Sequence, residues 1–214
     1  MAGERNLAAA SGGGIDWTRP NQGERRGLKR ATYEDVLSAP ENKVAEILDG
    51  ELFLSPRPAP RHAVACSGLN GALVPFVDGQ KGPGGWWILF EPELHFSEDV
   101  VVPDVAGWRR ERVPFLTGGP WSDIAPDWVC EVVSPSTESI DRGRKLRIYA
   151  REGVSHLWLV NPLAKTLEVY RLTDGRWTLL QTSVNDEVVQ AEPFENVSIE
   201  MSRWWLPESP PEPG

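Results

Sequence analysis

The chain has 214 residues, of which 40% are hydrophobic and ten are tryptophan, so it can bury a full core and one domain is expected. Its net charge of −9 argues against broad, nonspecific affinity for nucleic acid. No charged and then apolar leader opens the sequence, and no apolar run approaches the ~18 residues that a membrane span needs, which predicts a cytoplasmic protein without membrane contact. Cys66 and Cys130 lie in apolar surroundings and are expected to be buried free thiols.

The two ends of the sequence differ in composition from the rest. Residues 1–27 are rich in Gly, Ala, Asn and Arg without an apolar period, which predicts a disordered leader. Its basic excess suits an arm that contacts phosphate, but the preferred interpretation is excess sequence at the translation start. A single domain is expected over residues 28–206, and the Pro-rich residues 207–214 should form a frayed tail.

The first ordered elements are expected after residue 30. Thr32 is placed to cap a short helix over Tyr33–Leu37. Beyond it, Asp49-Gly50 stands between two apolar stretches and predicts a hairpin. Glu46 has apolar neighbours in the first arm of that hairpin, so it either faces a cleft or points to water.

A helix is predicted over His62–Val77. Its apolar residues recur at intervals of three and four, and a Gly/Pro run over residues 79–85 ends it. His62 at its start is either a substrate contact or, in the preferred interpretation, a capping or solvated histidine.

The segments Trp86–Phe96 and Val100–Trp108 predict another hairpin. Pro103 removes a backbone donor inside the second strand and so marks an edge or a bulge, where strands re-aim side chains. Asp104 follows it and is either re-aimed toward a site or merely the end of the strand. Arg109–Pro126 is a long loop, a plausible lip over a cleft, and its RRER cluster either faces phosphate or, as preferred, is solvated.

The stretch Asp127–Gly153 reads as a buried strand, a Ser/Pro turn and a helix. The strand carries Glu131 among apolar residues, and an ionised carboxylate there is costly to bury unless a cation or hydrogen bonds compensate it. The helix brings back Lys145, with Asp141 and Tyr149 four residues away on the same face. Four arginines make this helix locally basic: Arg142, Arg144, Arg147 and Arg151.

The last third predicts further strands. Val154–Val160 should be a strand, with His156 as a structural residue in it. Thr166–Leu172 and Trp177–Thr182 should form a hairpin across Asp174-Gly175. Residues 199–206, with two tryptophans, are either a closing segment of the fold or a dimer contact.

The acids on the predicted strands suggest metal chemistry. If Asp104 and Glu131 approach one point, their charges repel, and a hard divalent cation removes that conflict. Mg²⁺ prefers oxygen ligands and is often held by one or two carboxylates, Mn²⁺ is possible as well, and the carbonyl of Val132 could be a further ligand. Lys145 could hold the attacking water or offset charge on a phosphate. The competing interpretation is an ordinary ion pair between Glu131 and Lys145.

The sequence resembles the Uma-type family of putative restriction endonucleases, in the PD-(D/E)XK nuclease superfamily, in the segments VVPD, EVVSPST, DRGRKLRIYAREGV and HLWLVNP. The similarity runs from about Tyr33 to about Arg203, and the block from Pro126 to Pro162 is its specific part. The resemblance implies an α/β fold with a restriction-endonuclease-like mixed central sheet, flanked by helices and joined by additional antiparallel hairpins. It also implies Mg²⁺-dependent cleavage of phosphodiester bonds, and a nuclease of this type is expected to act as a homodimer on duplex DNA.

Residue by residue, the resemblance matches Asp104 with the PD acid and Glu131 with the (D/E) acid. Two residues after Glu131 the simple motif has lysine and this chain has Val133, so the lysine is expected on the helix as Lys145. Glu46 matches an early acid that the superfamily often adds to its metal site.

The predicted function is therefore that of a magnesium-dependent endonuclease. Its catalytic residues would be Asp104, Glu131, Lys145 and Glu46, and its metal ligands Asp104, Glu131 and Val132. The acidic net charge and the lack of a long basic stripe favour one alternative, a non-cleaving binding or scaffold module that keeps the fold. The same constellation would also serve a hydrolase of a small phosphate ester.

Overall fold

The computed structural model describes residues 30–77, 79, 82–116 and 118–207. The predicted leader over residues 1–27 and all but the first residue of the predicted tail lie outside the described residues, and the expected limits of the domain stay a prediction. In the part of the chain that is described, no helix combines the length and the apolar character needed to cross a membrane.

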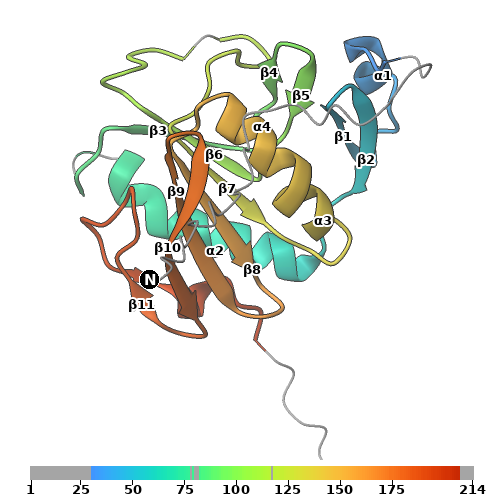
Figure 1. Ribbon diagram of the computed structural model, residues 1–214. Coiled ribbons are helices and arrows are strands. Elements are labelled where there is room, and N and C mark those ends of the chain that lie inside the picture. The colour runs from blue at the N-terminus through green and yellow to red at the C-terminus, as the bar shows by residue number, and fades with distance from the viewer. Residues whose placement is uncertain (1–29, 78, 80–81, 117, 208–214) are drawn as a thin grey trace, which may run out of the picture.

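A mixed sheet of six strands forms the centre of the molecule (Figure 1). Its order is β10-β9-β8-β7-β6-β3, in which β7 and β8 run parallel and all other neighbours run antiparallel. The predicted fold class, a mixed α/β sheet with antiparallel hairpins, is confirmed. The strands are β3 (Trp86–Phe90), β6 (Val105–Arg109), β7 (Trp128–Val132), β8 (His156–Asn161), β9 (Thr166–Thr173) and β10 (Arg176–Val184).

Two smaller sheets adjoin the central one. A four-stranded sheet has the order β2-β1-β5-β4, and a two-stranded sheet lies near the end of the described chain. Their strands are β1 (Lys43–Leu48), β2 (Glu51–Pro56), β4 (Leu94–Phe96), β5 (Asp99–Val101), β11 (Val188–Val189) and β12 (Ile199–Glu200).

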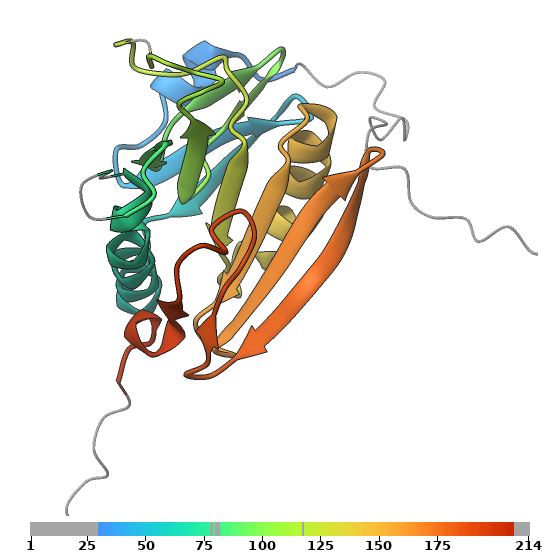
Figure 2. The ribbon, with the colours of Figure 1, turned by 90° about the vertical axis from the view of Figure 1, so that its left-hand side faces the viewer.

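Helices cover both faces of the central sheet (Figure 2). On one face, α2 (Pro60–Val77) and the 3₁₀ helix η2 (Met201–Trp204) share a hydrophobic core with the tryptophans of β7 and β8. On the other face, a second core holds the helical segment α3 (Glu138–Ile140), η1 (Asp141–Lys145) and α4 (Leu146–Arg151), together with residues of the smaller sheet. All five residues of β7 are buried, as expected for a central strand covered on both faces.

The local predictions for the first part of the chain are confirmed. Helix α1 spans Tyr33–Leu37 with Thr32 as its N-cap. The β1–β2 hairpin turns at Asp49-Gly50, whose φ angles of 55° and 79° are those of the tight turn that favours Asp-Gly. Helix α2 begins at Pro60, two residues before the predicted start, because proline is tolerated in a first helical turn.

The predicted hairpin over residues 86–108 is divided between two sheets. Its inner parts, β4 and β5, pair in the smaller sheet, whereas its outer parts, β3 and β6, pair in the central sheet. The second strand breaks at Val102, Pro103 and Asp104, where the proline cannot donate to a ladder. The chain thus leaves one sheet and enters the other at the predicted acid.

The sequence predicts one regular helix in the segment 138–151, but the structure shows a helix that is not α-helical throughout. Its middle, Asp141–Lys145, is a π-helical turn between two α-helical pieces. Such turns widen the helix locally and are frequent at functional sites.

The C-terminal predictions hold with small shifts of boundary. The β9–β10 hairpin turns at Asp174-Gly175, and β8 carries His156, which lies 3.3 Å from the carboxylate of Glu192. Trp204 and Trp205 are buried against α2 and the central sheet, so this segment closes the core of its own chain.

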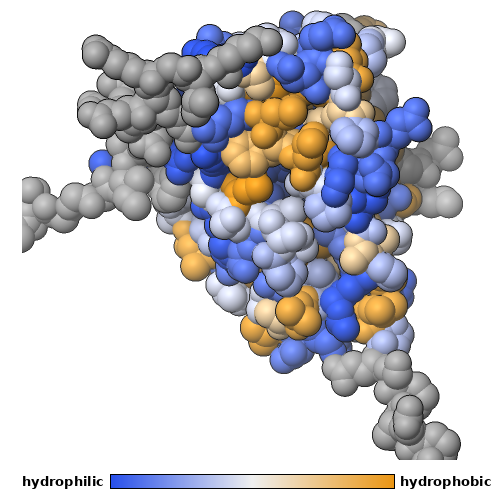
Figure 3. All heavy atoms as spheres, turned by 90° about the vertical axis from the view of Figure 1, so that its right-hand side faces the viewer, coloured by the Kyte–Doolittle hydropathy of each residue, from blue (hydrophilic) through white to orange (hydrophobic). Residues whose placement is uncertain are grey.

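The side of the molecule that carries β1, β2 and α3 in Figure 1 exposes apolar side chains between hydrophilic ones (Figure 3). On β2, an edge strand, Leu52 and Leu54 are 38% and 44% exposed.

Candidate functional site

A cavity of about 310 Å³ opens where β7 ends, between β1, the start of α2 and the segment Glu138–Lys145. The four side chains that the sequence singles out for chemistry all line it: Glu46, Asp104, Glu131 and Lys145. Val132, the predicted backbone ligand, lines it as well. The fold therefore brings every predicted site residue to one cavity.

Lys145 lies at the centre of this group. Its side chain is 4% exposed, and its Nζ lies 3.0 Å from Oε1 of Glu131 and 3.1 Å from Oε1 of Glu46. It also donates to the carbonyl of Val102 at 3.0 Å. Since an ammonium has three hydrogens to donate, these acceptors fix its position.

Glu131 is the most deeply buried acid of the cavity, with 2% of the residue exposed. Its Oε2 accepts from Lys145 at 3.1 Å, and its Oε1 accepts from the hydroxyl of Tyr149 at 2.5 Å. The helical segment that carries both donors packs across the end of β7. This packing lets Lys145, on the helix, reach the position that the lysine of the simple motif would occupy from the strand.

Asp104 holds a more open position, with 18% of its side chain exposed. The backbone N–H of Val132 donates to Oδ2 at 2.7 Å, and Nε2 of His62 lies 3.1 Å from Oδ1. Val132 thus contacts Asp104 through its backbone N–H. The role of the Val132 carbonyl as a metal ligand stays a prediction.

Burial and crowding set the protonation of the cavity. Burial raises the pKa of Glu131 well above its ordinary value, and neighbouring carboxylates add to this while Lys145 opposes it. Burial likewise raises the pKa of Asp141 to about 6. For Lys145, burial alone would lower the pKa, but the surrounding carboxylates outweigh it and raise the pKa well above its ordinary value.

The cavity offers carboxylate oxygens, the donors that a hard divalent cation takes, and one of these carboxylates, Glu131, forms an ion pair with Lys145. Five carboxylates (Glu46, Glu91, Asp104, Glu131 and Asp141) line the same cavity as the ammonium of Lys145, and a buried carboxylate is costly to leave ionised without a compensating cation. Carboxylate oxygens are the ligands that Mg²⁺ prefers. Asp104 and Glu131, with Glu46 as a further acid, are the side chains that could hold it.

The arginines of the helix do not form a basic surface beside the cavity. Arg142 binds Glu168 and Glu138, and Arg144 lies 2.8 Å from Glu51. The acids at the β1–β2 turn and on β5 take up the remaining two: Arg147 lies 3.5 Å from Asp49, and Arg151 pairs with Asp99. The locally basic helix of the sequence is therefore neutralised, largely by acids that are distant along the chain.

One further expectation, the preferred interpretation of His62, is wrong. His62 is neither a solvated nor a purely capping residue, because its side chain is 13% exposed and lies against Asp104. The loop predicted over Arg109–Pro126 lies away from this cavity, which none of its described residues lines; Arg109 and Glu111 line a different pocket, beside Trp86.

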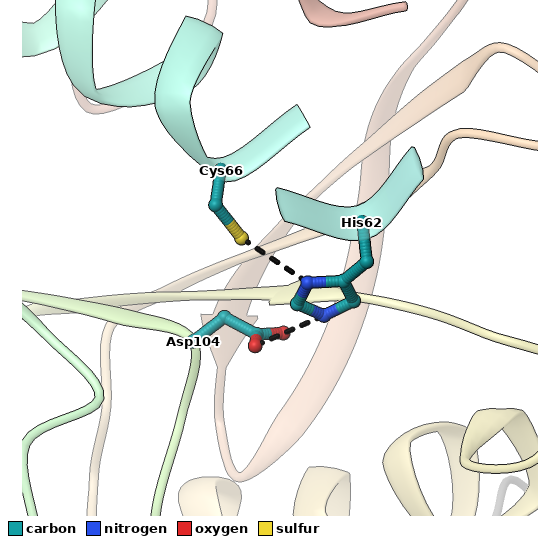
Figure 4. A group of neighbouring side chains, drawn as sticks. All are labelled: His62, Cys66 and Asp104. Carbon is teal, nitrogen blue, oxygen red and sulfur yellow. Dashed lines mark hydrogen bonds and ion pairs between the residues drawn. The ribbon is translucent and has the colours of Figure 1, made fainter. Parts of the chain in front are cut away.

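The sequence also left some contacts of the site unassigned. Tyr149 was placed on the face of Lys145 but not against Glu131. Cys66 lies 3.5 Å from Nδ1 of His62 (Figure 4). The available signal was the four-residue spacing of His62 and Cys66, which puts both on one face of α2.

Comparisons with known proteins point to one family. The sequence matches the Uma2 family, described as "Putative restriction endonuclease", over residues 21–202. A protein of Synechocystis sp., "Uncharacterized protein slr1290", is 27% identical over 149 residues, which make up 67% of this chain and 74% of that protein. The fold is similar to the crystal structure of "a putative nuclease belonging to DUF820" from Anabaena variabilis, with a TM-score of 0.62, 24% identity, and coverage of 81% of this chain and 98% of the other.

Proposed function

Because this chain belongs to the Uma2 family of putative restriction endonucleases, we propose that it is a divalent-metal-dependent nuclease that hydrolyses phosphodiester bonds. The observation that carries the proposal is the meeting of Asp104, Glu131 and Lys145 in one open cavity. The similar structure from Anabaena variabilis, titled a putative nuclease, supports it.

In this proposal Asp104 and Glu131 hold Mg²⁺ or Mn²⁺, and Glu46 is an additional ligand or a positioning acid. The bound ion would polarise a phosphoryl oxygen and lower the pKa of a coordinated water. Asp104 is oriented for this role by the N–H of Val132, and Glu131 by the hydroxyl of Tyr149.

Lys145 acts as a charged donor and not as a general base. Its raised pKa keeps the ammonium protonated at neutral pH, so it has no lone pair with which to accept a proton. It can instead hold the attacking water or offset negative charge that grows on the phosphate in the transition state.

Duplex DNA is the proposed substrate, and a homodimer in the cytoplasm is the proposed form of the protein. Two copies related by a twofold axis would address the two antiparallel strands of a duplex. Sedimentation equilibrium of the full chain would measure this, and a monomer at all concentrations would exclude the dimer.

A non-cleaving binding or scaffold module is the second candidate. The observation that favours it is the neutralisation of the helix arginines, which leaves them few charges to offer a nucleic acid backbone. Against it, each proposed catalytic position carries a side chain competent for the chemistry.

Plasmid nicking with Mg²⁺ or Mn²⁺, with and without a chelator, tests the proposal. We expect the wild type to nick the plasmid only with the metal, and Asp104→Asn to lose at least about a hundredfold in rate. The matched control is Asp123→Asn, an exposed acid that does not line the cavity, which should cleave like the wild type.

The other outcomes separate the alternatives. Equal cleavage by wild type and Asp104→Asn would point to a contaminating nuclease and remove the support for the site. No cleavage by either would favour the scaffold module. Metal-dependent hydrolysis of a small phosphodiester such as bis(p-nitrophenyl) phosphate, without cleavage of DNA, would favour the esterase alternative.

A further inference from the structure

His62, Cys66 and Asp104 form a group of side chains, at the edge of the cavity, that could hold a metal ion (Figure 4). The imidazole lies between the other two, with Nδ1 3.5 Å from the sulfur of Cys66 and Nε2 3.1 Å from Oδ1 of Asp104. One possible ligand atom from each residue lies within 4.8 Å of the other two. The proposed magnesium chemistry uses only Asp104 of these three.

The local structure explains why the three side chains converge. His62 and Cys66 are four residues apart in α2, a spacing by which a helix presents two ligands to one ion. Asp104 comes from the break between β5 and β6, where the chain passes the start of α2. Because His62 and Asp104 also line the cavity, a water molecule can reach a fourth position.

A thiol, an imidazole and a carboxylate in contact could also be a nucleophilic relay. Two observations argue against that function. Cys66 does not line the cavity, so a substrate there would not reach its sulfur. In addition, burial and nearby carboxylates raise the pKa of the Cys66 thiol, which disfavours a free thiolate nucleophile. A bound Zn²⁺ would supply the positive charge that stabilises the thiolate, and the thiol proton would be released to solvent on binding.

The donor chemistry favours zinc over magnesium. Zn²⁺ binds cysteine sulfur at about 2.3 Å and histidine nitrogen at about 2.0 Å, and three protein ligands with one water form a common open site. Mg²⁺ avoids sulfur, and its affinity for nitrogen and sulfur ligands is far below that of zinc. The possible ligand atoms lie up to 4.8 Å apart, and these distances must shorten by about 1 Å for all three atoms to bind one ion. The imidazole must also turn one nitrogen toward the ion. Rotation of the side chains can produce both movements.

We propose that His62, Cys66 and Asp104 form a Zn²⁺ site that shares Asp104 with the magnesium site, so that zinc inhibits the enzyme. Binding of zinc stands on the geometry of the three side chains alone. Inhibition rests in addition on the proposed nuclease function, because it works by withdrawing Asp104 from the magnesium ion.

Cobalt tests the binding without any need for activity. Co²⁺ replaces Zn²⁺ in such sites, and a thiolate ligand gives it an intense near-ultraviolet charge-transfer band. We expect this band in the wild type, its loss in Cys66→Ser, and an affinity for Zn²⁺ more than about tenfold weaker in that variant. The control is Cys130→Ala, which removes the other thiol, wholly buried in β7, and should keep the band.

A band that persists in Cys66→Ser, or that never forms in the wild type, would overturn the proposed site. If Cys66→Ser does not fold, His62→Asn provides the same test, because it keeps the thiol but removes the imidazole.

Inhibition is measured in the nicking assay with a fixed Mg²⁺ concentration and increasing Zn²⁺. Each protein is compared with itself through the Zn²⁺ concentration that halves its own rate. We expect this concentration to rise more than about tenfold in Cys66→Ser and to stay unchanged in Cys130→Ala. Equal sensitivity of wild type and Cys66→Ser would overturn the inhibition. If the wild type cleaves nothing, the nuclease function and the inhibition fail together, whereas the cobalt spectrum still decides the binding.

Discussion

Lys145 compensates buried negative charge that would otherwise destabilise the fold. Its ammonium contacts Glu131 and Glu46 at 3.0 and 3.1 Å and is almost completely buried. A buried ion pair contributes little net stability, but removing one partner leaves an uncompensated charge in a medium of low polarity. The consequences of a lysine substitution should therefore depend on whether the acids can take up protons.

Lys145→Met tests this dependence, because methionine has a similar length and no charge. We expect the free energy of unfolding to fall by about 3–5 kcal/mol at pH 8, and by less at pH 5, where the acids accept protons. Urea denaturation at the two pH values measures it. Lys43→Met, at the partly exposed start of β1, should change stability by less than about 0.5 kcal/mol. A Lys145→Met protein as stable as wild type at pH 8 would show that the lysine does not compensate these acids.

Asp141 should make stability depend on pH in the opposite direction to an ordinary salt-bridged acid. Burial raises its pKa from 3.8 to about 6, so between these values the folded state holds a proton that the unfolded state has lost. Linkage then makes stability rise as pH falls from about 7 to about 4, by about 3 kcal/mol for a shift of two units. We expect the free energy of unfolding of the wild type, minus that of Asp141→Asn, to increase as pH falls over this range. A difference that stays constant or decreases as pH falls would refute the raised pKa.

At the scale of elements, ion pairs attach the helical segment α3–η1–α4 to the β1–β2 hairpin. The turn residue Asp49 lies 3.5 Å from Arg147 and 4.0 Å from both Arg144 and Arg151. The hairpin carries Glu46 and the helical segment carries Lys145, so this attachment also holds two site residues in register.

Asp49→Asn should loosen this attachment without changing the turn, because asparagine tolerates the φ of 55° found at this position. We expect a loss of about 1 kcal/mol in the free energy of unfolding, since the pairs are partly exposed and screened, and a smaller loss at high salt. The matched control is Asp174→Asn, at the same position of the exposed β9–β10 turn, which should change stability by less than about 0.5 kcal/mol. If both substitutions change the free energy of unfolding equally, the ion pairs between Asp49 and the arginines contribute nothing to stability.

At the scale of the whole molecule, an acidic protein must offer specific cations to bind DNA. The net charge is −9, and the arginines of the helical segment are occupied by acids. Arg57, by contrast, is exposed and lines the cavity, where its guanidinium donates only to a backbone carbonyl, that of Glu41, among the contacts described. It is the best-placed side chain to meet a phosphate at the entrance.

Arg57→Ala should weaken binding of duplex DNA to a similar extent for all sequences. The slope of log affinity against log salt concentration should fall by about one, the value for one lost phosphate contact. Fluorescence anisotropy with Asp104→Asn protein measures binding without cleavage. Arg176→Ala, at the distant β9–β10 turn, is the control and should leave the slope unchanged. An unchanged slope in Arg57→Ala would place the phosphate contact elsewhere.

Local features of the sequence predicted most of the helices and strands, whereas the family resemblance supplied the fold class. The Asp-Gly turns, the apolar period of α2 and the apolar run around Glu131 depend on interactions between residues a few positions apart, which sequence displays directly. The division of the hairpin at Pro103 and the π-helical turn were not predicted, because both depend on packing against distant elements. Asp104 and Glu131 were selected as acids among apolar strand residues, and the resemblance in the PD and EVVSPST segments then matched them with the acids of the family motif.

The sequence by itself determined which side chains were available for metal chemistry, and only the tertiary structure decided which of them meet. The contacts of Lys145 with Glu46 and of His62 with Asp104 join residues far apart in the chain. The neutralised arginines show the same limit, because their partners Asp49, Asp99 and Glu168 lie on other elements. Electrostatic interaction depends on distance and burial in space, and neither quantity is contained in the order of residues.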